Sequence, residues 1–139
     1  MTNNRKLVLT SMFLIGFIMT MSFAYAEQVP VSLPQGTSVA GCEETNECFI
    51  PSMITVNPGD EVVWSNDDSV VHTVTSGTIS DADGLFDSNL FMAGETFSHT
   101  FDTLGNYDYF CKVHPWMVGQ VLVTVGGGIE KELGTITIG

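Results

Sequence analysis

Three side chains that bind soft metal ions lie close together near the end of the sequence. Cys111, His114 and Met117 follow one another at the spacing C-x₂-H-x₂-M, directly after a segment typical of a β-strand. A thiolate, an imidazole and a thioether suit a copper ion that changes between Cu(I) and Cu(II), and a second imidazole completes the usual ligand set. His72, which begins another predicted strand, is our candidate for that imidazole. We therefore predict a site for one copper ion at His72, Cys111, His114 and Met117.

The choice of the second imidazole is narrow, because the chain has only three histidines. His99 lies in the middle of a predicted strand, on the same face as Phe97 and Phe101, which is typical of a packed structural histidine. His72 follows a turn, at the end of the predicted fold where ligand loops meet. We interpret His72 as the ligand and His99 as structural.

The first 26 residues have the features of a secretory signal peptide. Arg5 and Lys6 precede an apolar run over residues 7–23, and Ala24-Tyr25-Ala26 forms a small-residue cleavage signal. The apolar run is shorter than the ~20 residues that a transmembrane helix needs, so we favour cleavage after Ala26 over an uncleaved anchor. We expect an exported protein on the periplasmic or extracellular side of a membrane, with peripheral or anchored membrane association left open.

The sequence is strongly acidic, with 16 acidic against four basic residues and a formal net charge of −12. All the acidic residues follow Ala26, so the exported chain is more acidic still. This charge excludes nucleic-acid binding, because contacts with phosphates need a basic surface. The acidic residues are spread along the chain, which favours a role in solubility over steering toward a cationic partner.

The number of cysteines is odd, which is informative in an exported protein. Cys42 and Cys48 lie close together in a polar segment, and we expect a disulfide between them in an oxidising compartment. Cys111 is then left over. Its strand places Tyr107, Tyr109 and Cys111 on one inward face, where a thiolate is costly unless a metal binds it. The spare thiol therefore supports the metal site.

The rest of the chain alternates short β-rich runs with Gly, Pro, Asn and Asp, which predicts an all-β sandwich or barrel. Residues 80–90 are expected to form a long loop. Asn66 is the first candidate for a hydrogen bond that ties the two ligand loops together, and Thr73 is its nearest rival. The predicted strands are 29–33, 53–56, 61–65, 72–76, 96–101, 105–110 and 119–125.

We divide the chain into three parts. Residues 1–26 form the signal peptide and residues 27–126 form one domain, of which 27–52 are an N-terminal extension that contains the expected disulfide. Gly126-Gly127-Gly128 ends the domain. Residues 127–139 form a tail or one extra edge strand, because Thr135-Ile136-Thr137-Ile138 alternates polar and apolar residues.

Several motifs between Met53 and Val125 resemble the cupredoxins, the small type 1 blue copper proteins, and most of all the amicyanin and plastocyanin branch. The short C-x₂-H-x₂-M loop is the amicyanin-like form. The residues that carry the resemblance are Val56-Asn-Pro-Gly-Asp60, Val63-Trp-Ser-Asn66 leading to His72, Phe86-Asp-Ser88, Gly94-Glu-Thr-Phe97, and Gly105-Asn-Tyr-Asp-Tyr109 running into Cys111–Met117.

The resemblance implies a Greek-key β-sandwich of about eight strands that binds one copper ion. It implies that His72, Cys111 and His114 are equatorial ligands, that Met117 is the axial ligand, and that the protein transfers single electrons between larger redox proteins. Two features depart from the family pattern. Thr73 follows the first histidine where the family often has Asn, and residues 29–48 are not part of the usual core.

Three alternatives to an electron carrier follow from the same residues. An extracytoplasmic copper carrier or chaperone uses similar ligands, and a metal-free Ig-like surface module would leave Cys111 as a buried thiol. A copper enzyme needs a second metal site, and only His99 remains to build one. We therefore expect a monomeric protein that is not an enzyme, with redox proteins as electron donor and acceptor.

Overall fold

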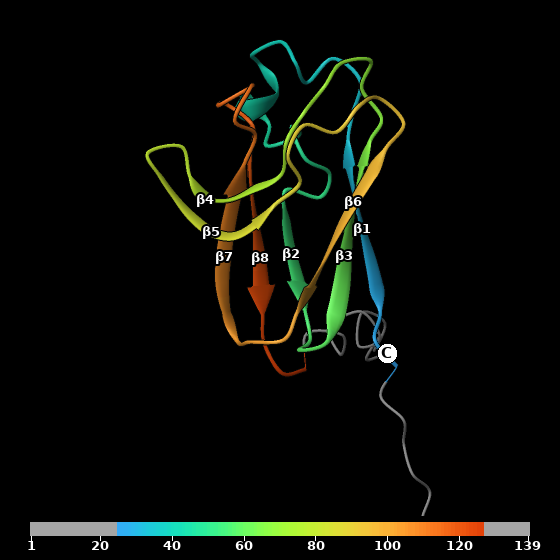
Figure 1. Ribbon diagram of the computed structural model, residues 1–139, viewed down its shortest axis with the longest axis vertical. Helices are drawn as coiled ribbons and strands as arrows, with labels where there is room; N and C mark the ends of the chain where they lie inside the picture. Colours follow the sequence, from blue (N-terminus) through green and yellow to red (C-terminus); the bar gives the residue numbers. More distant parts are fainter. Residues whose placement is uncertain (1–24, 127–139) are drawn as a thin grey trace, which may run out of the picture.

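The computed structural model describes residues 25–126, and within this range the chain forms two β-sheets that pack face to face (Figure 1). One short 3₁₀ helix, η1 (Cys42–Glu44), precedes the second strand. The strands are β1 (Gln28–Leu33), β2 (Met53–Val56), β3 (Asp60–Asn66), β4 (Thr75–Thr78), β5 (Asp81–Asp87), β6 (Thr96–Phe101), β7 (Gly105–Phe110) and β8 (Val118–Val123).

The two sheets have the strand orders β1-β3-β6 and β2-β8-β7-β4-β5. β1 pairs in parallel with β3, and β2 pairs in parallel with β8, whereas the other pairings are antiparallel. The chain crosses between the sheets after β1, β2, β3, β5 and β6, so that strands adjacent in sequence are often not adjacent in a sheet. These crossed connections are those of a Greek key. The predicted all-β Greek-key sandwich of about eight strands is confirmed.

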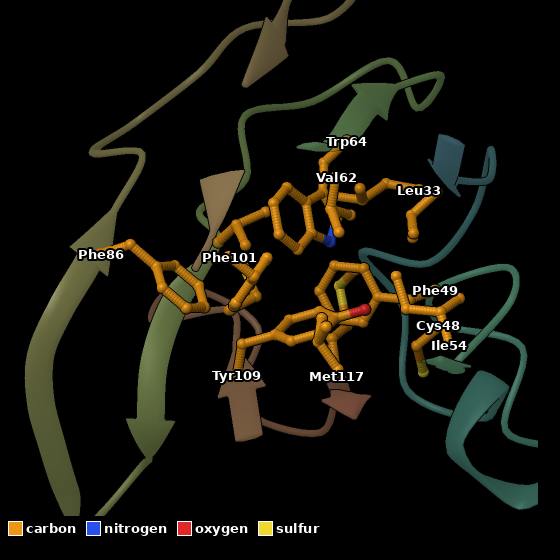
Figure 2. Packing of buried hydrophobic residues seen from close by; sticks show 14 of the residues in the cluster. Leu33, Cys48, Phe49, Ile54, Val62, Trp64, Phe86, Phe101, Tyr109 and Met117 are labelled. Atoms are coloured by element: carbon orange, nitrogen blue, oxygen red, sulfur yellow. The ribbon is translucent and has the colours of Figure 1, made fainter. Parts of the chain in front are cut away.

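β3 illustrates why these residues form half-buried strands. Asp60, Val62, Trp64 and Asn66 are buried, while the residues between them are partly exposed. This period of two matches the alternation of side chains across a strand. The apolar members of the row point into the space between the sheets and place Trp64 in the centre of the core (Figure 2).

The core around Trp64 is largely aromatic. The Trp64 side chain is fully buried, and the centre of its ring lies 5.3 Å from Tyr109, 5.7 Å from Phe97 and 5.9 Å from Phe86. Tyr109 in turn packs edge-on against Phe49 at 4.9 Å. Aromatic pairs at such distances are favourable beyond the area that they bury. The rings therefore hold the ends of β3 and β7 in fixed relative positions.

Two sequence predictions about strands are wrong. Residues 80–90 were expected to form a loop, but β5 runs over Asp81–Asp87 and pairs with β4. Most of β5 is exposed, so it lacks the apolar alternation that marks a half-buried strand. The strand expected at 72–76 begins only at Thr75, and His72 forms an isolated bridge with Phe91.

The two ends of the described chain lie side by side. Tyr25, Ala26, Val125 and Gly126 line one shallow hollow together with the turn at residues 57–60. This hollow is at one end of the sandwich, and the loop between β7 and β8 is at the other (Figure 1).

Residues 25–126 contain no helix long and apolar enough to span a membrane. Residues 1–24 of the predicted signal peptide and the predicted tail at 127–139 lie outside the described residues.

Candidate metal centre

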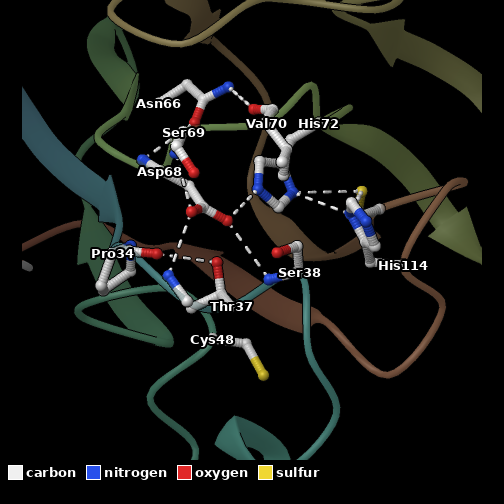
Figure 3. A network of polar contacts seen from close by, with 12 residues as sticks. Pro34, Thr37, Ser38, Cys48, Asn66, Asp68, Ser69, Val70, His72 and His114 are labelled. Carbon is white, nitrogen blue, oxygen red and sulfur yellow. Dashed lines mark hydrogen bonds and ion pairs between the residues drawn. The ribbon is translucent and has the colours of Figure 1, made fainter.

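Three of the predicted ligands converge at one end of the sandwich. The Cys111 sulfur lies 3.7 Å from Nδ1 of His72 and 3.7 Å from Nδ1 of His114, and the two Nδ1 atoms are 3.1 Å apart. Figure 3 shows both imidazoles turned toward the same point. Nitrogen and thiolate ligands lie about 2.0–2.3 Å from a bound transition metal. Three donor atoms at these separations therefore fit around one ion.

The loop between β7 and β8 is closed by its own backbone. The amide of Cys111 donates to the carbonyl of Met117 at 3.1 Å, and the amide of Met117 donates to the carbonyl of His114 at 2.9 Å. Cys111 directly follows β7, and its side chain is buried, as is that of Tyr109 two residues before it. Three predicted ligands are thus held by one rigid loop.

Met117 contributes to this end of the core as well. Its side chain is fully buried and belongs to the central hydrophobic cluster (Figure 2). The fourth predicted ligand therefore lies on the closed loop, shielded from solvent. Its role as the axial ligand stays a prediction.

All three cysteines lie in the described part of the chain, and their states differ. Cys42 and Cys48 form a disulfide, which confirms the sequence prediction. Cys111 is free and buried. Although burial raises the pKa of the Cys111 thiol, the net shift is downward, because the contact with His72 and the backbone N–H groups of Thr73, Val113 and His114 favour the thiolate. These donors favour the thiolate, which is the form that binds metals.

His72 is oriented by a buried carboxylate that the sequence analysis missed. Nε2 of His72 lies 2.9 Å from Oδ2 of Asp68, and both side chains are buried. Burial opposes protonation of His72, yet contacts with Cys111 and Asp68 raise its pKa. Burial also opposes ionisation of Asp68, but hydrogen bonds from Gly36, His72 and further backbone amides hold its pKa well below the usual range. A carboxylate four residues before the histidine was the available signal in the sequence.

His114 differs from His72 in its environment. Its side chain is half-buried, and its ring lies 5.4 Å from the ring of Trp116. Burial and the neighbouring His72 lower the pKa of His114, against a smaller opposing effect of Asp68. A lower pKa keeps the imidazole neutral, and a neutral imidazole can bind a metal. His114 is therefore the predicted ligand with a route to solvent.

Thr73, and not Asn66, links the two ligand loops. The backbone N–H of Thr73 donates to the Cys111 sulfur at 3.3 Å, and the Thr73 hydroxyl accepts the backbone N–H of Lys112 at 2.8 Å. The Asn66 amide donates instead to the carbonyls of Val70 and Phe91, at 2.8 and 3.1 Å. Asn66 thus shapes the turn before His72 without reaching the loop of Cys111.

Comparison with known proteins agrees with this geometry. The family model described as copper binding proteins of the plastocyanin/azurin family matches residues 37–124. The chain belongs to this family. The cupredoxin resemblance inferred from its motifs is therefore confirmed.

The curated relatives in this family are amicyanins and plastocyanins. Amicyanin from Paracoccus versutus is 29% identical over 91 residues, which cover 66% of this chain and 67% of that protein. Chloroplastic plastocyanin from Tetradesmus obliquus is 36% identical over 83 residues, covering 54% of this chain and 57% of the plastocyanin. The match thus spans little more than half of that plastocyanin and two thirds of the amicyanin.

The fold also matches solved cupredoxin structures. A purple cupredoxin from Nitrosopumilus maritimus aligns with a TM-score of 0.62 and 32% identity, over 69% of this chain and 99% of that chain. Its whole length thus corresponds to a part of the present chain, in agreement with a single cupredoxin sandwich.

In this cupredoxin, His99 lies outside the cluster of His72, Cys111 and His114. Its ring packs against Phe86 at 4.7 Å and against Phe101 at 4.8 Å. Burial lowers the pKa of His99, against a smaller opposing effect of Asp102. His99 is therefore a packed structural histidine.

The lowered pKa of His99 predicts a pH dependence of stability. The folded state binds the His99 proton more weakly than the unfolded state, where the pKa is about 6.5. The contribution of His99 to the free energy of unfolding is therefore complete above about pH 6.5 and is lost as the pH falls. Urea unfolding of the copper-free protein at several pH values, compared with His99→Gln, measures this contribution. A wild-type curve parallel to that of His99→Gln between pH 5 and 7 contradicts the prediction.

Proposed function

We propose that this chain is a type 1 copper protein that carries single electrons between larger redox proteins outside the cytoplasm. The observation that carries the proposal is the set of donor atoms at the end of the sandwich. The free thiol of Cys111 and two Nδ1 atoms face one point at separations of 3.1–3.7 Å. Met117 is buried on the same loop and is the proposed axial ligand.

Each proposed ligand has a distinct role. Bound copper supplies a one-electron couple between Cu(I) and Cu(II). Cys111 and His72 are fully buried and exclude water, and the hydrogen-bonded loop keeps the donor atoms in place in both oxidation states. His114 is partly exposed, so we propose its ring edge as the point where electrons enter and leave. A rigid site that changes little between oxidation states suits electron transfer.

The same observations favour a carrier over an enzyme. The chain has three histidines, and two of them belong to the proposed copper site. His99 packs between aromatic rings and has no second imidazole with which to bind another metal. We therefore propose a monomeric electron carrier without a catalytic copper, whose donor and acceptor are other redox proteins.

We further propose the domain division and location that the sequence indicates. Residues 1–26 direct export and are removed, residues 27–126 form the copper domain, and residues 127–139 follow it. The expected compartment is oxidising, and the Cys42–Cys48 disulfide supports this, because such bonds persist outside the cytoplasm.

The test is to add Cu(II) to the purified copper-free protein and record its visible absorption and EPR spectra. We expect an intense visible band from the thiolate and a narrow copper hyperfine splitting, at one copper per chain. His99→Gln is the matched control, because it removes a histidine outside the cluster, and we expect its spectra to be unchanged. A colourless copper complex with a wide splitting would support the copper carrier, and absence of binding would support the metal-free surface module.

A further inference from the structure

A third loop reaches both ligand loops at this end of the sandwich. It comprises residues 34–48, which we call the disulfide segment because it contains the Cys42–Cys48 bond. Figure 1 shows it at the same end of the molecule as the loop between β7 and β8. Its contacts with the predicted copper ligands pass through two intermediates, Asp68 and Trp116.

The first contact links the disulfide segment to His72 through the carboxylate of Asp68. The backbone amides of Gly36 and Ser38 donate to the two carboxylate oxygens of Asp68, at 3.0 and 3.2 Å (Figure 3). The Ser69 amide donates to the carboxylate at 2.8 Å, and Nε2 of His72 lies 2.9 Å away. In the tautomer that leaves Nδ1 of His72 free to bind a metal, Nε2 carries the proton and donates it to Asp68. Removing the two amides of the disulfide segment would leave this buried carboxylate with only the Ser69 amide and His72 to hold it.

The second contact links the disulfide segment to His114 through the indole ring of Trp116. The indole N–H of Trp116 donates to the carbonyl of Thr37 at 2.9 Å, and the Trp116 ring lies 5.4 Å from the ring of His114. Thr37 is itself buried, and its hydroxyl donates to the carbonyl of Pro34 at 2.9 Å. Residues 36–38 thus contact both Asp68, which lies beside the His72 imidazole, and Trp116, which lies beside the His114 imidazole.

The disulfide segment is anchored at both ends. Before it, β1 pairs with β3 along its whole length. After it, Cys48 and Phe49 are buried in the core, and Ile50 exchanges two backbone hydrogen bonds of 2.8 Å with Ser32. The Cys42–Cys48 bond then shortens the free part of the segment and restricts the positions open to residues 36–38.

We propose that the disulfide segment is a positioning element for the metal centre: through Asp68 and Trp116 it fixes the orientation of both imidazoles, and the Cys42–Cys48 bond maintains that hold. The inference extends the proposed function, because it takes His72 and His114 as metal ligands. It assigns a role to a part of the chain that lies outside the two ligand loops.

The test compares two variants and a control in the copper-free protein. Trp116→Phe removes the indole N–H but keeps an aromatic ring, and Cys42→Ala/Cys48→Ala removes the bond. Val123→Ala, in β8 at the far end of the sandwich, is the control for general loss of stability. Hydrogen exchange at the amides of residues 72, 111 and 117, with NMR of the two imidazoles, is the measurement.

In the cysteine variant we expect exchange at these amides to be at least about 10-fold faster than in a Val123→Ala protein of equal stability. The His72 Nε2 proton signal should broaden. Trp116→Phe should change the His114 signals while leaving those of His72 as they are. After copper is added, the cysteine variant should lose the metal about 10–100-fold more readily.

Wild-type exchange and unchanged imidazole signals in both variants would overturn the inference. If the cysteine variant does not fold, Trp116→Phe decides alone, since it keeps the disulfide and both sheets. Because these readouts need no metal, they remain valid if the wild-type protein gives no blue copper spectrum. Absence of a blue copper spectrum would overturn the proposed function, whereas the hydrogen exchange and NMR data would still decide whether the disulfide segment positions the imidazoles.

Discussion

A Cys111→Ser variant is expected to bind Cu(II) without the intense visible band, and to hold copper at least about 100-fold more weakly than the wild type. Removing a residue that hydrogen-bonds to a metal ligand already lowers the metal affinity about 10–100-fold, and removing the strongest ligand itself lowers it more. A serine hydroxyl does not ionise near neutral pH and is a hard donor, whereas copper prefers the thiolate. Visible titration with competition by a chelator measures both effects.

The fold of this variant should remain intact. Cys111 and Ser differ by one atom, and the backbone bonds of the loop, from Cys111 to Met117 and from Met117 to His114, do not involve the side chain. Far-UV circular dichroism and the urea midpoint of the copper-free variant provide the control. Retention of the intense band in the folded variant would show that the thiolate is not a ligand.

A Trp64→Ala variant is expected to lose about 3–5 kcal/mol of the free energy of unfolding, which is the usual cost of deleting a fully buried large ring. Single domains are stable by only about 5–15 kcal/mol, so this loss removes a large part of the total. The cavity would open among Phe86, Phe97, Phe101 and Tyr109, whose rings all contact Trp64. Urea unfolding of the copper-free protein measures the change.

Trp64→Phe is the matched comparison, since it keeps an aromatic ring in the same space and should cost less. Trp64 is not one of the predicted ligands, and Tyr109, which packs edge-on against it, lies two residues before Cys111. We therefore expect copper binding by Trp64→Phe to resemble that of the wild type. An equal loss of stability in both variants would show that the indole makes a contact that a phenyl ring cannot replace.

The sequence was sufficient to predict the features that depend on spacing and alternation. The loop of Cys111, His114 and Met117 lies between two strands, and three donors on one short loop must lie close together. His72 was chosen by elimination among three histidines, and its imidazole does face the cluster. The disulfide between Cys42 and Cys48 followed from their proximity in the chain.

The features that depend on long-range contacts were not predictable. The spacing of Asp68 and His72 was a local signal, but the amides of residues 36 and 38 that hold the Asp68 carboxylate come from a distant part of the chain, and the sequence does not show this contact. Asn66 was the preferred candidate in the sequence and this prediction is wrong, because only the packing of the loops brings Thr73 to Cys111 and Lys112. β5 was missed because an exposed edge strand with Gly84 and three aspartates has no apolar alternation.

The placement of the chain ends has a practical consequence for tethering. Residues 25 and 126 leave the sandwich together, at the end opposite the ligand loops (Figure 1). The two ends of the sandwich are separated by about the length of β3, which is about 20 Å. A fusion protein, a surface linker or a lipid attached at either point would therefore hold the domain with His114 facing outward. Immobilisation through either end of this domain should leave its site free to meet a partner or an electrode.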